Sequence, residues 1–435
     1  MPLASGQPPH TGAARAAVNT RVALWVLTVI FFMWGFLTSL NDALIPHLKS
    51  VFELNYTRAM LVQFTFFGAY FLMSLPAGRL VARLGYKNGI VAGLVIAGIG
   101  ALGFWPSAQL RIYEAFLASL FVLATGITIL QVAANPYVAL LGPAETSSSR
   151  LTLAQALNSL GTTVGPLMGG LLILGTTVRS GDEIAAMPAS EQLAYRAAEA
   201  QSVQGPYVGL AIALVVLAVI VFMFRLPPLA DASGQNDHGR HTLMDALREP
   251  HVLFGVLAIF FYVGGEVSIG SFMVNYLSMP QIGGLSEQDA TKYVSMYWGG
   301  AMVGRFAGSW LLARFSPGRL LGLFAAINVA LLAGTLATTG TTALYCIVAT
   351  GLFNSIMFPT IFALGIARLG ALTSKASSLL IMAIVGGAVM PLVQGALADH
   401  IGLQASFIVP LVCYLYIIFY GLVGSRPRAA LAARN

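Results

Sequence analysis

Charged side chains are scarce in this sequence. They make up 9% of the 435 residues, whereas hydrophobic side chains make up 57%. A soluble domain carries about 25% charged residues, so this composition excludes an ordinary soluble globular protein and predicts an all-α membrane protein with several spans. No stretch between the apolar runs is long enough to fold by itself, and the function is therefore expected to reside in the membrane.

Cysteines and catalytic motifs are also few or lacking. The two cysteines, Cys346 and Cys413, both sit in apolar runs, which excludes a disulfide framework and a cysteine-based metal cluster. The sequence contains no HExxH, GxSxG or glycine-rich phosphate-binding motif. We therefore predict that the protein is not an enzyme and uses no cofactor or metal.

Twelve hydrophobic runs are each long enough to cross a hydrocarbon core of roughly 30 Å as a helix, at about 1.5 Å per residue. They cover residues 22–46, 59–81, 89–105, 112–141, 151–175, 207–224, 252–279, 291–312, 319–338, 343–369, 377–398 and 404–423. The sequence thus predicts a tail at 1–20, a six-helix bundle at 21–225, a linker at 226–250, a second six-helix bundle at 251–424 and a tail at 425–435. Residues 1–20 have no apolar core of the signal-peptide type.

The distribution of basic residues predicts the orientation. If both termini and the linker are cytoplasmic, 17 of the 23 lysines and arginines fall on the inner side and six on the outer side. That asymmetry is typical of multi-pass proteins of a bacterial inner membrane. It also accounts for the net charge of +7, so we expect no nucleic-acid partner.

The two predicted bundles repeat one another. Short motifs recur at nearly constant offsets: Gly161, Pro166 and Gly170 correspond to Gly386, Pro391 and Gly395, and Ala77-Gly78 corresponds to Ala307-Gly308. A parallel repeat of two six-helix halves joined by a linker is the architecture of the major facilitator superfamily. We therefore expect 12 transmembrane helices in two pseudo-repeated bundles.

Four segments resemble one branch of that superfamily, the fucose/glucose/galactose–proton symporters. They are Trp34–Asp42, Gln131–Tyr137, Arg150–Asn158 and Pro359–Ile366, of which the Ala-Ala-Asn-Pro-Tyr and Arg-Leu-x-x-Ala-Gln motifs are the most specific. The resemblance covers nearly the whole chain. It implies transport of a sugar together with a proton.

The resemblance also implies which acids take part in transport, but this sequence departs from the family at one of the two positions. In this family, acids on the first and fourth helices are implicated in transport; Asp42 matches the first, but Gln131 stands at the second. The seventh helix instead carries Glu266, and the pairing of Gln131 with Glu266 resembles the glucose and galactose branch. Either the coupling carboxylates are redistributed between the halves, or the proton stoichiometry or the coupling itself differs.

The chemistry of Asp42 and Glu266 supports the same assignment. A carboxylate at bilayer depth costs about 2.5 to 3.5 kcal/mol on insertion scales, so such acids mostly face a polar pathway. We expect Asp42 to be the main proton carrier, with Glu266 tuning it or binding a sugar hydroxyl. The alternative for Asp42 is a structural hydrogen-bonding role beside Asn41.

A neutral sugar needs amide and hydroxyl partners in fixed directions and an apolar or aromatic face for its ring. The candidate substrate-binding residues are Asn41, Gln131, Asn135, Gln155 and Asn158 in the first half and Tyr262, Asn275 and Asn354 in the second; Tyr297, Trp298 and Gln394 are further candidates in the second half. The alternative is that these amides form hydrogen bonds between helices, and that Asn135 belongs to a kink at Pro136.

Basic residues at the cytoplasmic joints are candidates for conformational gating. Arg83 and Lys87 lie at the joint of the first half, and Arg314 and Arg319 lie at the corresponding joint of the second. We expect them to stabilise the outward-open state by capping helix ends or pairing with acids. The alternative is that they are solvated residues of positive-inside loops.

These observations predict a monomeric secondary transporter that imports a hexose, either glucose or galactose or else fucose, by alternating access with proton symport. Its expected partners are the sugar, the proton and the lipid bilayer. A sodium-coupled or uncoupled sugar carrier is the alternative. A channel or sensor of the same fold is less favoured, because the polar residues are scattered over both halves rather than lining one pore.

Overall fold

The structure is a computed structural model. It describes residues 22–38, 56–110, 112–172, 187–188, 190–192, 204–224, 226–227 and 242–427, without the side chains of 56–60, 63, 165–172 and 287–288. Throughout this part of the chain the regular structure is helical. The predicted all-α fold is confirmed.

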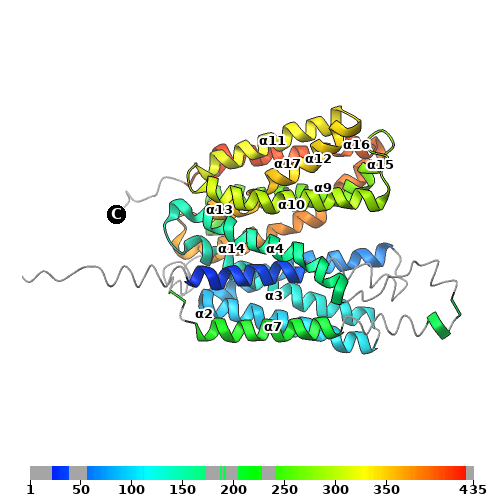
Figure 1. Cartoon of the computed structure of the whole chain (residues 1–435). Helices are drawn as coiled ribbons and strands as arrows, with labels where there is room; N and C mark the ends of the chain where they lie inside the picture. The colour runs from blue at the N-terminus through cyan, green and yellow to red at the C-terminus, as the bar shows by residue number, and fades with distance from the viewer. Residues whose placement is uncertain are drawn as a thin grey trace, which may run out of the picture.

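Among the described residues, the first half contains five long helical elements. They are the helix Val22–Thr38, α2 (Tyr56–Leu110), α3 (Tyr113–Leu140), α4 (Ser147–Leu172) and α7 (Gln204–Met223). The element α2 is two helices that run in opposite directions, because the chain turns at Gly85 with φ 79° and ψ 165° (Figure 1). Only glycine adopts that conformation without a steric penalty.

The second half begins with α9. Its helices are α9 (Pro250–Leu277), α10 (Glu287–Leu312), α11 (Pro317–Ala337), α12 (Gly340–Asn354), α13 (Met357–Gly365), α14 (Thr373–Met382), α15 (Gly386–Ile401), α16 (Leu403–Ser406) and α17 (Ile408–Phe419). Three pairs are interrupted single passes: α12 and α13 are separated by Ser355 and Ile356, α14 and α15 by the 3₁₀ turn Ala383–Val385, and α16 and α17 by Phe407.

These helices make twelve passes, as the hydropathy pattern predicts. Eight stretches of the described part are long and apolar enough to cross a membrane, and one of them, Phe64–Leu110, contains both helices of α2. The helix Val22–Thr38 and the less apolar α4 and α10 supply the remaining passes. Apolar side chains of α7 such as Ile212 and Phe222 are exposed, as a lipid-facing surface requires.

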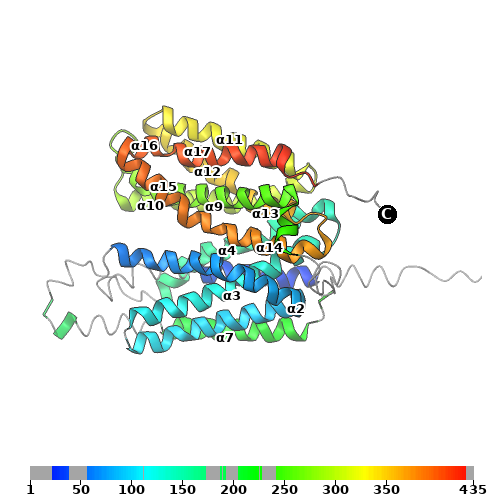
Figure 2. The same ribbon diagram turned by 180° about the vertical axis from the view of Figure 1, so that it is seen from behind.

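The two halves lie side by side as separate bundles (Figures 1 and 2). They contact one another chiefly through two helix pairs, α4 with α10 and α2 with α14. These pairs are equivalent under the internal repeat, because α4 corresponds to α14 and the first helix of α2 corresponds to α10. The sequence repeat is therefore also a repeat in space.

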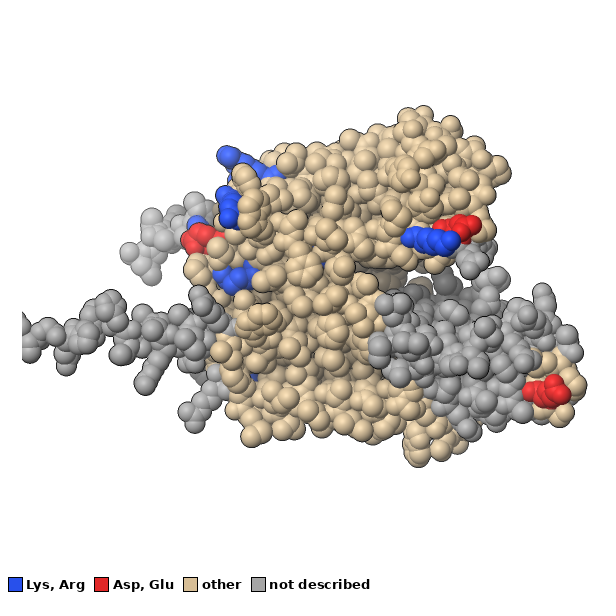
Figure 3. Space-filling view, viewed as in Figure 1, with Lys and Arg blue, Asp and Glu red and all other residues tan. Residues whose placement is uncertain are grey.

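Lysine and arginine gather at one end of the bundle, which we call the basic end (Figure 3). It includes the turn within α2, the start of α4 and the α10–α11 and α13–α14 turns, with Arg79, Arg83, Lys87, Arg150, Arg314, Arg319, Arg368 and Lys375. At the opposite end, Lys292 pairs with Asp289 at 2.8 Å, and both side chains are exposed.

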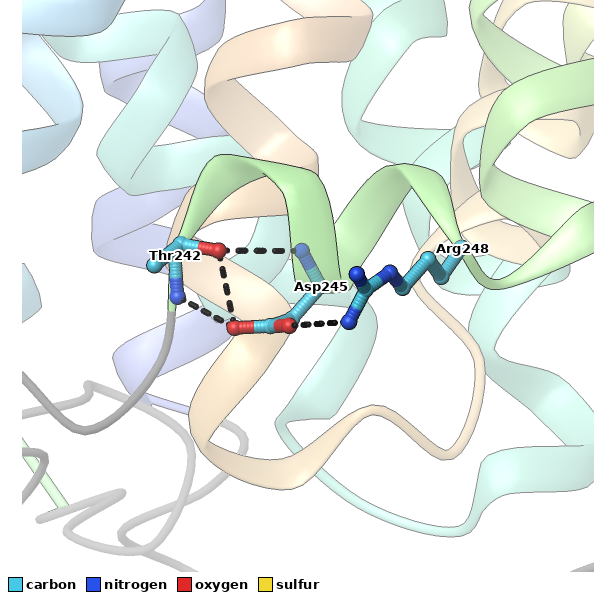
Figure 4. Close-up of polar contacts among 3 residues, drawn as sticks. All are labelled: Thr242, Asp245 and Arg248. Atoms are coloured by element: carbon cyan, nitrogen blue, oxygen red, sulfur yellow. Dashed lines mark hydrogen bonds and ion pairs between the residues drawn. The ribbon is translucent and has the colours of Figure 1, made fainter.

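A short helix, α8 (Leu243–Leu247), lies within the predicted linker at 226–250. The Thr242 hydroxyl accepts a hydrogen bond from the Asp245 backbone amide, while the Asp245 carboxylate accepts from the Thr242 backbone amide and hydroxyl (Figure 4). This capping box satisfies donors at the helix start. Arg248 lies 3.5 Å from the same carboxylate, and α8 packs against α9 and α14.

Candidate functional site

A buried polar cluster lies where α12 ends in the middle of the second half. The side chain of Asn354, the last residue of α12, is fully buried. Its Oδ1 accepts hydrogen bonds from Asn328 Nδ2 at 2.7 Å and from Tyr414 Oη at 2.6 Å, and its Nδ2 donates to Tyr297 Oη at 2.8 Å. Asn354 thus joins α10, α11 and α17 at the break in its own helix.

Glu266 is attached to this cluster through Tyr262. The two side chains are one helical turn apart on α9, and Tyr262 Oη donates to Glu266 Oε1 at 2.7 Å. The same hydroxyl lies 3.1 Å from the backbone carbonyl oxygen of Asn354. Tyr297 Oη lies 3.3 Å from the backbone carbonyl oxygen of Glu266. The predicted residues Tyr262, Glu266 and Asn354 therefore form one hydrogen-bonded group, which also includes Tyr297.

The first half contributes amides rather than acids to the described interior. Gln131 Nε2 lies 2.6 Å from Tyr70 Oη, and Gln155 Nε2 lies 3.5 Å from Asn135 Oδ1. All three amide side chains are buried. Within the described part, Gln131 Oε1 and Asn135 Nδ2 have no hydrogen-bond partner. Unsatisfied buried polar atoms are costly, so these two are suited to receive the hydroxyls of a bound polyol.

Asn158 has a different position. Its Nδ2 donates to the backbone carbonyl of Phe31 at 3.0 Å, which ties α4 to the helix Val22–Thr38. The side chain is only partly buried. This contact is a hydrogen bond between helices, which is the alternative role predicted for the buried amides. It occupies one of the two N–H donors of the Asn158 amide.

Arg305 lies between the halves, within the predicted span 291–312. It is on α10, where its Nη1 donates to Ser159 Oγ of α4 and its Nε lies 3.3 Å from the carbonyl oxygen of Ser355 in the α12–α13 break. Within the described part no carboxylate lies within ion-pair distance of it. Arg305 is one of the 17 basic residues counted on the inner side, but it lies seven residues before the end of the predicted span 291–312, and this position was the signal for a buried role.

Several predicted residues are not part of this group. Asn275 is exposed at the far end of α9, where it lines a separate cavity of about 480 Å³ with Ser278 and Leu403. Trp298 is also exposed, and Gln394 is buried with its Nε2 3.4 Å from Ser406 Oγ. Asn41 and Asp42 lie outside the described residues.

Two of the four predicted gating residues contact groups of their own half. Lys87 Nζ donates to the Phe222 carbonyl at the end of α7 at 2.7 Å, and the Arg314 guanidinium lies 3.9 Å from the centre of the Trp310 ring. Arg83 and Arg319 are exposed. Lys87 thus contacts a carbonyl at the end of α7, and the gating role of the four residues stays a prediction.

Hydroxyl groups make the contacts between the halves near the basic end. Ser149 Oγ donates to the Ser309 carbonyl at 2.7 Å, and Ser309 Oγ donates to the Ser149 carbonyl at 3.0 Å. In the repeated position, Ser374 Oγ donates to the Gly78 carbonyl at 3.1 Å. Together with Arg305–Ser159, these bonds hold the halves together from the basic end to the middle of the bundle.

Comparison with known proteins agrees with this geometry. Residues 24–384 match the model of the Major Facilitator Superfamily. The chain is 52% identical over 425 residues to a glucose/galactose transporter of Brucella abortus, covering 98% of this chain and 99% of that one. It is 34% identical to the L-fucose-proton symporter of Escherichia coli, covering 91% of each.

The structure is similar to a solved transporter as well. A Major Facilitator Superfamily transporter, FucP, crystallised in the outward conformation, superposes with a TM-score of 0.87 at 32% identity, covering 93% of this chain and 98% of that one. The predicted major facilitator fold is thereby confirmed.

Proposed function

The chain belongs to the major facilitator superfamily, a family of multi-pass membrane transporters, and on that premise we propose that it imports a hexose, glucose or galactose, by alternating access in symport with a proton. The observation that carries this proposal is that both halves bury polar groups in their interior. The first half buries amides on α3 and α4, the second half holds the Tyr262–Glu266 pair on α9, and Arg305 links Ser159 of α4 to the Ser355 carbonyl beside Asn354. The name of the relative from Brucella abortus supports the choice of sugar.

Gln131, Asn135 and Gln155 are proposed as sugar ligands. Their amides suit a neutral polyol because each can donate to one hydroxyl and accept from another. Asn158 and Asn41 are proposed to complete this side of the site. Tyr262 and Asn354 act in the second half by holding the opposing surface, since the side-chain amide of Asn354 is already bonded to three neighbours. Asn275 lies at the end of the bundle opposite the basic end, and it is proposed to contact the sugar only while the sugar passes through that end.

The structure supports a state closed at the basic end. Its interhalf hydrogen bonds reach from Ser149 at the start of α4 to Thr163 Oγ1, which lies 3.5 Å from Met302 Sδ. We assign the basic end to the cytoplasm of a bacterial inner membrane, because basic residues are retained on that side. Both termini are then cytoplasmic. This state is outward-open, and breaking the hydroxyl contacts opens the inward path.

Proton coupling is assigned to Asp42 and Glu266. The sugar is neutral, so the proton carries the only net charge and transport is electrogenic. A carboxyl group facing a site that is alternately wet and dry can bind a proton on one side and release it on the other. Arg83, Lys87, Arg314 and Arg319 are proposed to influence the rate of the conformational change rather than the site.

The deciding experiment is sugar transport in vesicles that contain the purified protein. We expect the protein to act as a monomer. Labelled glucose and galactose are expected to exchange for unlabelled sugar in counterflow, and an inward proton gradient is expected to drive accumulation. Accumulation that follows sodium instead would identify a sodium symporter, and exchange without accumulation would identify an uncoupled carrier. Sugar flux without counterflow would identify a channel and contradict the proposal.

A further inference from the structure

We propose that Tyr262 transmits the proton occupancy of Glu266 to the break between α12 and α13 by reversing the direction of one hydrogen bond. This inference rests on the proposed function, because it assigns a step within proton coupling. It makes Tyr262 a positioning residue for coupling rather than a sugar ligand.

Tyr262 Oη faces two acceptors with one hydrogen. Glu266 Oε1 lies 2.7 Å away and the Asn354 carbonyl oxygen lies 3.1 Å away. A tyrosine hydroxyl can donate only one hydrogen bond at a time. The Tyr262 side chain is fully buried, so no bulk water replaces the missing bond. The protonation state of Glu266 therefore decides which of the two acceptors receives the hydrogen bond from the Tyr262 hydroxyl.

The two states differ by a single proton. When Glu266 is a carboxylate, it can only accept, and Tyr262 donates to it in a charge-assisted hydrogen bond. When a proton from water binds to Glu266, the new carboxyl O–H can donate to Tyr262 Oη. The Tyr262 hydrogen is then free to turn to the Asn354 carbonyl. No other covalent bond changes, and the reverse step returns the proton to water.

The Asn354 carbonyl is placed to pass this change on. It belongs to the end of a helix, where carbonyls lack partners within the helix. The next carbonyl along the chain, that of Ser355, accepts from Arg305, which also donates to Ser159 in the other half. Proton binding thus strengthens the link of α9 to the break, one peptide unit from a contact between the halves.

Other titratable groups face Glu266 from the helices packed around it. They are Arg305 and Tyr297 on α10 and Tyr414 on α17, beside Tyr262 on α9 itself. The positive charge of Arg305 acts on Glu266 whether or not the Tyr262 hydroxyl is present. A change in the behaviour of Glu266 that follows removal of the Tyr262 hydroxyl alone therefore reports the hydrogen bond between these two side chains.

A spectroscopic test measures this bond directly. Infrared difference spectra of the full-length protein in lipid, recorded on a pH step, are expected to contain a carboxylic-acid band that disappears in Glu266→Gln. In Tyr262→Phe this band is expected to move to higher frequency, because the carboxyl O–H has lost its acceptor. Tyr276→Phe is the matched control, since Tyr276 is a buried tyrosine of the same helix that donates to the Thr335 carbonyl at 2.9 Å.

Transport provides the second measurement. Tyr262→Phe is expected to lower proton-driven accumulation about 10-fold while sugar counterflow stays within about 3-fold of wild type, the effect of losing one hydrogen bond to a charged group. Tyr276→Phe is expected to change neither. If Tyr262→Phe does not fold, the phenol C–O band of wild type, expected to be absent from the difference spectrum of Glu266→Gln, supplies the same information.

The outcomes separate this inference from the proposed function. An unmoved carboxylic-acid band in Tyr262→Phe, or accumulation equal to wild type, overturns the role of Tyr262 while leaving sugar–proton symport intact. Wild-type protein that exchanges no sugar contradicts the proposed function instead. A moved band together with lost accumulation and retained counterflow supports the hydrogen-bond reversal.

Discussion

The two halves of the molecule present different chemistry to the middle of the membrane. In the first half, Tyr70 is paired with the amide of Gln131 at 2.6 Å; in the second, Tyr262 is paired with the carboxyl group of Glu266 at 2.7 Å. The partner of each tyrosine is of nearly the same size, but only the second can bind and release a proton. Within the described part, the first half is thus suited to a neutral ligand and the second to a charge.

This difference suggests that the two tasks of a symporter are divided between the halves. Gln131, Asn135 and Gln155 would hold the sugar, and Glu266 would respond to the proton. Arg305 contacts both halves, through Ser159 of the first and the Ser355 carbonyl of the second. Asp42 belongs to the first half by sequence, so its behaviour decides whether the division is strict.

The largest effect is expected from the two acids. Asp42→Asn should abolish uphill sugar accumulation but retain counterflow, because exchange needs no net proton movement. Glu266→Gln should reduce accumulation less. Both are measured in vesicles with labelled sugar and an imposed proton gradient. If Asp42→Asn still concentrates sugar and Glu266→Gln does not, the proton is handled by the second half alone; if both concentrate it, neither acid couples.

The next largest effect is expected at the proposed sugar-binding amides of the first half. Leaving a buried sugar hydroxyl or its partner unpaired costs roughly 1 to 3 kcal/mol, so Gln155→Ala should weaken sugar binding on the order of 10- to 100-fold. Asn158→Ala should weaken it as well. Equilibrium binding in detergent measures both, with Gln281→Ala at an exposed position as the control. Wild-type affinity in both variants would place the sugar elsewhere.

A smaller effect is expected where the repeated halves touch. A Cβ at Gly78 would lie 1.8 Å from Ser378 Oγ across the interface, whereas a Cβ at Gly308 would lie 2.1 Å from Ile356 Cγ2 in its own half. Overpacking of this kind costs about 1 to 3 kcal/mol. Gly78→Ala should therefore open the basic end, and Gly308→Ala should instead lower the melting temperature of the protein.

Thiol labelling measures the opening. Thr152 is fully buried, and its hydroxyl has no hydrogen-bond partner within the described part, so Thr152→Cys in a chain without the two native cysteines is a mild reporter. Labelling should be several-fold faster in Gly78→Ala than in Gly209→Ala, whose added methyl meets nothing within 4 Å. Equal labelling in the two variants would mean that the Gly78 contact does not hold the closed state.

The smallest effect is expected at the turn within α2 at the basic end. Arg83 is exposed, so Arg83→Gln should lower the transport rate only a few-fold and leave sugar affinity nearly unchanged. Initial uptake rates and binding, measured on the same preparations, check this. Lys87→Gln should have a larger effect, because it leaves the end of α7 without its cap. An unchanged rate in both variants would remove the gating role of this joint.

Much of the site could be predicted from sequence, because polar residues within apolar spans are rare and stand out. Gln131, Gln155, Glu266 and Asn354 were found in this way, and the structure places them in the interior. What the sequence could not predict is which atoms remain available. Asn354 is bonded to residues 26, 57 and 60 positions away in the chain, and no local pattern encodes such partners. Tyr70, Asn328 and Tyr414 were overlooked for the same reason.

The sequence by itself determined the class, the twelve passes and the family. In lipid every backbone polar group must be bonded within its own segment, so each long apolar run is obliged to form a helix wherever it packs. Only the tertiary structure decided that Arg305 bridges the halves, that Lys87 caps α7 and that Ser149 and Ser374 close the basic end. These contacts join helices far apart in sequence, and their partners are set by how the two bundles pack rather than by the composition of either.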